Sequence, residues 1–134
     1  MTDVSLELQG EIYDSLRTNA GLISEVGARI RDRPEKSIAF PYVSFGPVTA
    51  VSDDADCITA YELDVQIDVW SRAVGSVECK TIADLVRIAV LDGSISLTDN
   101  ALVMIEHRST RYLDDPDGIT HHAAISFTAV IEQG

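Results

Sequence analysis

The sequence has little positive charge. Ten of its 134 residues are lysine or arginine, 22 are aspartate or glutamate, and the formal net charge at pH 7 is −12. Proteins that read DNA or RNA, and proteins that bind anionic membranes, draw much of their affinity from basic side chains. The composition therefore disfavours both functions. Long apolar runs are missing too, because no segment approaches the roughly 20 apolar residues of a membrane-spanning helix.

Cysteine is also scarce. Cys57 and Cys79 are the two cysteines of the chain, which are too few for a disulfide framework, and we expect both to be free. Residues 1–8 contain acids rather than a basic start followed by an apolar run, so we do not expect a signal peptide. A chain without a signal peptide folds in a reducing compartment, where disulfides are rare.

The motifs of common enzyme classes are absent. The sequence has no Gly-x-Ser-x-Gly elbow, no glycine-rich phosphate loop and no calcium loop of spaced acids. His107, His121 and His122 carry metal-binding chemistry, but adjacent residues of a strand point to opposite faces, so the last two are poorly placed to share one ion. The acids of segment 114–117 are typical of a turn that caps its own backbone.

The remaining composition is typical of one globular domain. Hydrophobic residues make up 46% of the chain and charged residues 24%, which is ordinary for a soluble fold. The length is that of a single domain, and the sequence contains no repeat, linker or low-complexity tract. We therefore predict one domain over residues 1–134.

Periodic apolar residues predict the helices. A four-residue spacing predicts a helix over residues 4–18, with Asp3 as its cap. A short helix is expected at 22–26, and a second long helix over 77–91, with Ser76 as its cap. The apolar stripe of the first helix consists of Val4, Leu8, Ile12 and Leu16.

Alternation of apolar and polar residues predicts the strands. The alternation is regular over residues 58–71 and follows a strand over 42–51, and the polar link between these two strands predicts a long hairpin. Two further strands, over 102–113 and 119–131, flank an Asp-Asp-Pro-Asp-Gly turn. A short strand followed by a long loop is expected within residues 28–41.

The order of these elements predicts an α+β fold. Helices and antiparallel hairpins are partly segregated, which favours one twisted, mostly antiparallel sheet of hairpins with the two main helices packed on one face. In the last hairpin, the apolar faces agree if Leu113 lies opposite Ile119 and Ile105 lies opposite Phe127. The same pairing would set His121 opposite Arg111, which disfavours a cation site there.

Two features favour a binding surface over a catalytic site. The segment 28–41 is the most basic part of an acidic chain, and it is either a solvated loop or a docking surface for an acidic partner. Trp70 falls by alternation on the polar side of its strand. Either the pattern breaks at the strand end, or Trp70 is an exposed anchor with Arg72, since both residue types are enriched at interface hot spots.

Five segments together resemble a known family. In order and spacing they are similar to the small tail terminator, or tail completion, proteins of long-tailed bacteriophages and phage-like gene transfer agents. The resemblance runs from Leu8 to about Glu132. The five segments are the helix over 8–16, residues 26–34 (Val-Gly-Ala-Arg-Ile-Arg-Asp-Arg-Pro), Phe40-Pro41-Tyr42-Val43, Asp68-Val69-Trp70-Ser71-Arg72, and Asp115-Pro116-Asp117-Gly118-Ile119-Thr120-His121-His122.

The resemblance implies a structural virion protein with no catalytic activity, cofactor or metal. Such proteins form a hexameric ring that caps the head-proximal end of the tail tube and stops its polymerisation. They also meet the head-completion, or stopper, protein, and they are assembled in the host cytoplasm. DNA passes through the ring without specific binding. A net charge of −12 fits such a conduit, because an acidic wall does not hold phosphates.

The resemblance and the charge pattern together give two candidate sites. The side chains expected to dock against the tail or a neighbouring subunit are Arg29, Arg31, Arg33, Trp70 and Arg72. The side chains expected to line the lumen, on charge alone, are Asp53, Asp54, Asp56, Glu62 and Asp64.

Other interpretations of the sequence stay open. One is a metal-binding domain or enzyme that uses His107, His121, Asp115 and Asp117. A second is another virion part, either a head–tail connector or stopper, or the tail tube protein itself. A third is a soluble adaptor that acts as a dimer.

Overall fold

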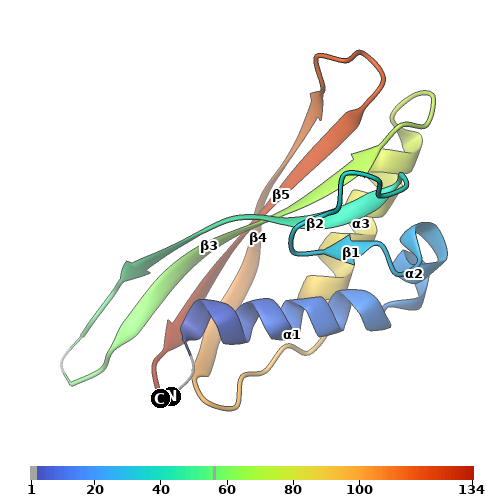
Figure 1. Ribbon diagram of the computed structural model, residues 1–134. Coiled ribbons are helices and arrows are strands. Elements are labelled where there is room, and N and C mark those ends of the chain that lie inside the picture. The colour runs from blue at the N-terminus through green and yellow to red at the C-terminus, as the bar shows by residue number, and fades with distance from the viewer. Residues whose placement is uncertain (1–2, 56) are drawn as a thin grey trace.

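The sheet is the centre of the fold (Figure 1). The computed structural model describes residues 3–55 and 57–134. Its sheet has the strand order β1-β2-β3-β5-β4, with β1 parallel to β2 and the other neighbours antiparallel. The predicted α+β class is therefore confirmed. The elements are α1 (Val4–Thr18), α2 (Ala20–Val26), β1 (Ile30–Arg31), β2 (Tyr42–Ser52), β3 (Ala60–Ser71), α3 (Val77–Asp92), β4 (Ala101–Asp114) and β5 (His121–Glu132).

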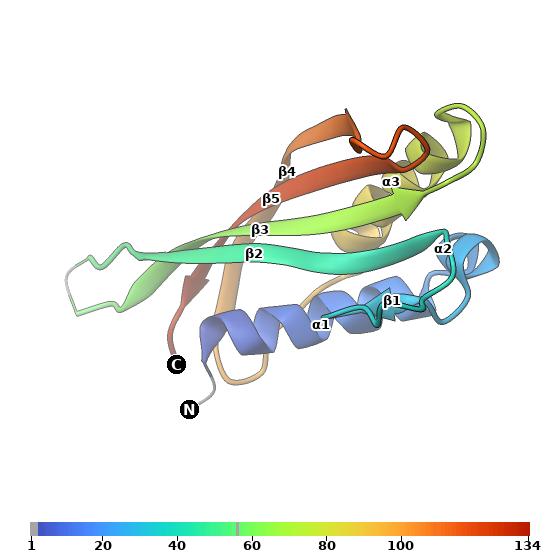
Figure 2. The same cartoon turned by 45° about the horizontal axis from the view of Figure 1, so that its top comes forward.

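The helices cover one face of the sheet. Helix α1 begins at Asp3, whose carboxylate accepts a hydrogen bond from the Leu6 amide at 3.1 Å. The predicted stripe of α1 is buried, and it joins one core with the buried residues of α3 and with alternate residues of β3 and β5, such as Ile67 and Phe127. None of the described helices lies over the opposite face (Figure 2), which we call the uncovered face. No described helix is long and apolar enough to cross a membrane.

The start of α3 differs from the prediction. Ser76 precedes the helix but makes no side-chain cap hydrogen bond, and its φ of −104° and ψ of 0° already lie in the helical region. The first-turn carboxylate of Glu78 instead accepts a hydrogen bond from the Ser71 hydroxyl at 2.8 Å. The connection between β3 and α3 is thus held by a side chain of the strand.

The predicted register of the β4–β5 hairpin is wrong. Leu113 lies opposite His122, and Ile105 lies opposite Ala129, because β5 begins later than expected and β4 contains two irregularities, between Leu102 and Met104 and between His107 and Ser109. Relative to the predicted pairing, the partner is displaced by two residues at Ile105, which leaves side chains on their original face, and by three residues at Leu113, which does not. The apolar pattern alone therefore did not fix the register.

At one edge of the sheet, the short strand β1 covers only part of β2. Strand β1 pairs only with Val43 and Ser44, and a further irregularity follows between Phe45 and Val48. Beyond that point, β2 and β3 continue as a long hairpin that projects past the helices (left in Figure 1). Strand β4 forms the other edge.

A single carboxylate joins α1 to the segment before β4. Glu7 accepts hydrogen bonds from the amides of Thr98, Asp99 and Asn100 at 3.2, 2.9 and 3.1 Å, and also from the Thr98 hydroxyl and the Asn100 side chain. These bonds, that from the Asp99 amide foremost, lower the pKa of Glu7 from its ordinary value of 4.5. The ionised carboxylate is therefore the form that the fold stabilises.

We expect Glu7→Gln to lower the thermal midpoint by a few degrees at neutral pH and to flatten its acid dependence. A lowered pKa in the folded state contributes stability above pH 4.5, and this contribution is lost as the pH falls through the lowered value. Thermal unfolding followed by circular dichroism between pH 3 and 7 measures the effect. Glu25→Gln, at an exposed position of α2, is the control and should follow the wild-type profile.

Candidate docking surface

Three rings stack across the uncovered face, and a fourth meets them at an angle. Tyr42, Trp70 and His122 lie directly opposite one another on β2, β3 and β5. The ring centroids of Trp70 and His122 are 3.9 Å apart with an interplanar angle of 8°, and those of Tyr42 and Trp70 are 6.2 Å apart. Phe40, from the loop before β2, adds a ring 5.0 Å from Tyr42. We call these four residues the aromatic row.

Polar groups fix the aromatic row in place. The Trp70 indole N–H donates to the Ser44 hydroxyl at 3.1 Å. The Nε2 atom of His122 lies 2.7 Å from a carboxylate oxygen of Asp68, whose side chain is 8% exposed. Because an ionised carboxylate only accepts hydrogen bonds, Nε2 carries the proton. Gln66 donates to the same oxygen at 2.8 Å, so the buried charge of Asp68 is held on two sides.

Arg72 connects the aromatic row to the turn between β4 and β5. Its guanidinium carbon lies 4.2 Å from the centre of the Phe40 ring, a favourable cation–π contact. Its Nε donates to the Thr120 hydroxyl at 2.9 Å, and a terminal nitrogen lies 3.6 Å from the Asp117 carboxylate. The side chain remains 48% exposed, so it can still meet a partner.

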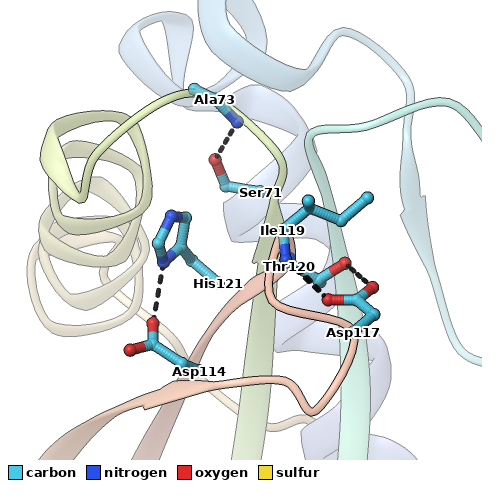
Figure 3. Close-up of polar contacts among 7 residues, drawn as sticks. All are labelled: Ser71, Ala73, Asp114, Asp117, Ile119, Thr120 and His121. Carbon is cyan, nitrogen blue, oxygen red and sulfur yellow. Dashed lines mark hydrogen bonds and ion pairs between the residues drawn. The ribbon is translucent and has the colours of Figure 1, made fainter.

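The turn itself is pinned by one acid (Figure 3). Asp117 accepts hydrogen bonds from the amides of Ile119 and Thr120 at 2.9 and 2.8 Å, and from the Thr120 hydroxyl at 2.6 Å. These bonds, the last foremost, lower the pKa of Asp117. Gly118 has a φ of +77°, a conformation that glycine adopts without strain. The Asp-Pro-Asp-Gly motif is thus a rigid turn, as its residue types predicted.

Apolar side chains stand exposed beside this turn. In the neighbouring β3–α3 connection, the Ser71 hydroxyl accepts the Ala73 amide at 3.3 Å (Figure 3), and the turns are adjacent because Ser71 pairs with His121. Val74, Val77 and Ile119 are 104%, 76% and 58% exposed. These side chains form an exposed apolar surface at this end of the molecule, a feature typical of interaction sites.

The structure brings together some of the predicted interface residues. Trp70 lies in the aromatic row and Arg72 at its end. Arg29 donates to the Pro41 carbonyl at 2.9 Å and so holds the loop that carries Phe40. Arg31 contacts the Ala28 carbonyl and lies 3.3 Å from Glu35.

The other predicted residues lie apart from the aromatic row. Arg33 is exposed in the loop after β1. The candidate lumen acids belong to the projecting half of the β2–β3 hairpin (Figure 1). Asp53, Asp54 and Glu62 are exposed, and Asp64 pairs with Arg108 at 3.2 Å. Asp56 lies outside the described residues.

The residues of the metal or enzyme interpretation do not converge. His121 lies opposite Asp114, at 2.9 Å, and not opposite Arg111 as the predicted register required. His107 contacts Thr110 at 2.7 Å. Within residues 3–55 and 57–134, no group of three or more histidine, cysteine or acidic side chains is placed to hold a metal ion. Burial raises the pKa of the Cys79 thiol to about 11, which makes it a poor nucleophile.

Sequence reasoning missed part of this surface. Phe40, Tyr42, Asp68 and His122 were in the motifs that carried the resemblance, but no role followed from them. The missing information was strand register, since only the pairing of β2, β3 and β5 puts Tyr42, Trp70 and His122 side by side.

Comparisons with known proteins identify the family to which the chain belongs. It is similar to a chain in the virion of a native gene transfer agent (GTA) particle, with a TM-score of 0.90 and 25% identity over 98% of this chain and 99% of that one. It also shares the fold of the bacteriophage SPP1 gp17 protein, with a TM-score of 0.66 and 19% identity over 93% and 88% of the two chains. The fold is therefore one that phage and phage-like particles use. The model of the family "Tail completion protein gp17" matches residues 10–132, and the chain belongs to this family. A search of curated proteins gives no match.

Proposed function

We propose that this chain forms a six-membered ring at the head-proximal end of a phage-like tail tube, where it stops tube polymerisation and joins the tail to the head. The observation that carries the proposal is the family match over residues 10–132, together with the full-length similarity to a chain of a GTA virion. The surface supports it, since its side chains are arranged for contact with other proteins.

The uncovered face suits the wall of a DNA channel. Glu62 and Asp64 project from β3 on the same side as Asp68 and Trp70, because alternate residues of a strand share a face. No described helix covers this side. We propose that the face lines the lumen with Glu62 and Asp64, and that Asp53 and Asp54 continue the acidic lining toward the hairpin tip. Acidic walls repel phosphates, so DNA would pass without being held.

The aromatic row and the adjoining turns suit a partner protein. We propose that Trp70 and Arg72 contact the tail tube protein or the stopper protein, with Arg29, Arg31 and Arg33 along the neighbouring edge. Aromatic and arginine side chains at the centre of such a surface supply most of the binding energy, and charges at its rim mainly guide association.

The oligomeric state tests the proposal. Light scattering on the purified protein at low and moderate salt, followed by negative-stain imaging, should give closed rings of about six subunits, as the resemblance to tail terminators implies. Each subunit carries a charge of −12, so screening by salt should favour ring closure. If the protein is monomeric, tail tube protein is added as a template. Long filaments of this chain alone would indicate a tube protein instead, and the absence of rings both alone and on tubes would overturn the proposal.

We expect Arg33→Glu to reduce tail completion several-fold and to weaken its salt dependence. Arg33 is exposed in the basic loop, and reversal of a rim charge acts mainly on the rate of association. The yield of completed tails, assayed in vitro at two salt concentrations, measures the effect. Arg17→Glu, on the helix side of the molecule and paired with Asp14 at 2.9 Å, is the matched control. Equal yields for Arg33→Glu and wild type would exclude the basic loop from docking.

A further inference from the structure

We propose that neighbouring copies of this chain join through antiparallel pairing of the free edge of β2 in one copy with the free edge of β4 in the next. This inference rests on the ring proposed above and names its subunit contact. It follows from the strand pairing, the exposed side chains at the two edges and the direction of the chain in the sheet.

Both edges offer free backbone groups. Strand β1 pairs with Val43 and Ser44 only, so the part of β2 from Val48 to Ser52 has a partner on one side, β3. Strand β4 is paired only with β5. A strand edge with free N–H and C=O groups is a ready template for another chain. Strand β1 also ends the sheet, but it is two residues long, so β2 and β4 carry the long free edges among the strands in residues 3–55 and 57–134.

The regularly paired parts of β2 and β4 lie at the same position along the strands, on opposite edges of the sheet. After its irregularity, β2 is regular from Val48, and β4 is regular between its two irregularities, from Met104 to His107. Successive pairings through β3 and β5 connect Val48 to His107, and Val51 to Met104. A copy rotated about an axis roughly parallel to the strands therefore brings one regular edge to the other.

Strand direction also agrees with this contact. Strands β2, β3, β5 and β4 alternate in direction across the sheet. After such a rotation, β2 of one copy runs opposite to β4 of the other, which gives the more stable antiparallel ladder. Because the two edges are different surfaces, the contact is heterologous and repeats from copy to copy until a ring closes.

The side chains at the β2 edge are unusual for solvent, whereas the regular part of β4 contains one exposed charge, Glu106. Residues 47–52 (Pro-Val-Thr-Ala-Val-Ser) contain no charge in a chain that is 24% charged. Val51 is 56% exposed, and Val103, beside the regular part of β4, is 55% exposed. Solitary edges usually carry lysine or other charges that prevent pairing. The absence of charge on β2 fits an edge that is covered after assembly.

The pairing leaves the proposed functional surfaces free. It uses backbone groups in the plane of the sheet, so the uncovered face with Glu62 and Asp64 still faces one side and the helices the other. The aromatic row lies at the other end of β3, at Trp70, away from the level of Val48 to Val51. A ring joined in this way would have helices outside and acids inside.

Ala50→Pro removes one backbone donor at the β2 edge. The Asp53 amide donates to the Ala60 carbonyl at 2.8 Å, and N–H groups alternate along a strand, so the Val51 amide faces β3 and the Ala50 amide faces the free edge. Proline is tolerated where the N–H of an edge strand points to solvent. We expect a folded monomer that forms no rings at a concentration where the wild type is fully assembled. Ala20→Pro, at the exposed first position of α2 and after the extended residue Asn19, is the matched control and should still form rings.

Hydrogen exchange gives a second measurement that does not depend on the proline variant. In assembled wild type, on tail tubes if these are needed, amides in 48–51 and 104–107 should exchange more slowly than in dilute monomer. Rings formed by Ala50→Pro, or unchanged exchange in both segments of assembled wild type, would overturn the edge pairing and leave the ring proposal intact. A wild type that forms no ring, alone or on tubes, would overturn both. If Ala50→Pro does not fold by circular dichroism, the exchange result decides.

Discussion

Trp70→Ala should raise the concentration of protein needed to complete half of the tails about 30-fold, because truncation of a hot-spot tryptophan costs about 2 kcal/mol of binding free energy or more. Trp70 is the centre of the aromatic row, stacked on His122 at 3.9 Å and next to Tyr42. Its replacement by alanine removes contact area with the partner and also leaves one face of the His122 ring without its stacking contact. Titration of the variant into tails that lack this protein measures the effect.

A control separates the docking role of Trp70 from its part in the fold. Ser44→Ala removes the acceptor of the indole N–H, at 3.1 Å, and keeps the ring. We expect it to lower stability by about 1 kcal/mol and to complete tails at the wild-type concentration. Circular dichroism at the assay temperature should show both variants folded. Completion of tails by Trp70→Ala at the wild-type concentration would remove the aromatic row from the docking surface.

Phe127→Ala should destabilise the fold by about 3–5 kcal/mol, the usual cost of truncating a fully buried phenylalanine. Phe127 is 0% exposed and lies on β5 between the sheet and the helices. Its ring also meets His107 edge-on at 5.9 Å, so the variant leaves both a cavity and an unsupported ring. For a chain of this length the thermal midpoint should fall by about 10–20 °C.

Urea denaturation tests this expectation. The midpoint should fall while its slope stays unchanged, which shows that stability and not the extent of unfolding has changed. Val130→Ala is the matched control, because Val130 lies on the same strand but on the uncovered face, where it is half-buried. It should cost about 1 kcal/mol or less. Similar losses for the two variants would contradict the assignment of the core to the helix-covered face.

The acidic and basic side chains are separated on the molecule, as the proposed DNA channel and docking surface require. Acids gather on the projecting hairpin and on the uncovered face, whereas the basic side chains near the aromatic row are largely engaged with their own loops. Arg29 holds the Pro41 carbonyl, and Arg31 holds that of Ala28. The basic stretch therefore shapes the docking surface as well as charging it, which its sequence did not reveal.

Local patterns along the chain predict most of the elements and the face on which their side chains lie. The stripe of α1, the alternation of β3 and the Asp-Pro-Asp-Gly turn are local patterns with periods of 3.6 and 2 residues, and local physics is sufficient for them. The family resemblance, carried by five short segments, was also present in the sequence and is confirmed by the family match. The missing cap hydrogen bond at Ser76 could not be predicted from local patterns, because the competing bond between Ser71 and Glu78 depends on how β3 meets α3.

Which residues of different strands meet depends on contacts between distant parts of the chain. Each irregularity in β2 and β4 shifts its ladder by one residue, so the two in β4 together shift it by two, and a shift of two leaves the apolar pattern unchanged. Tyr42, Trp70 and His122 are neighbours because of the β2–β3 and β3–β5 registers, and the irregularities in β2 and β4 help to decide which residues of the two free edges lie at the same position along the strands. Periodicity fixes the face on which a side chain lies, whereas long-range hydrogen bonding fixes its neighbours. The proposed docking surface and the proposed subunit contact both depend on those neighbours.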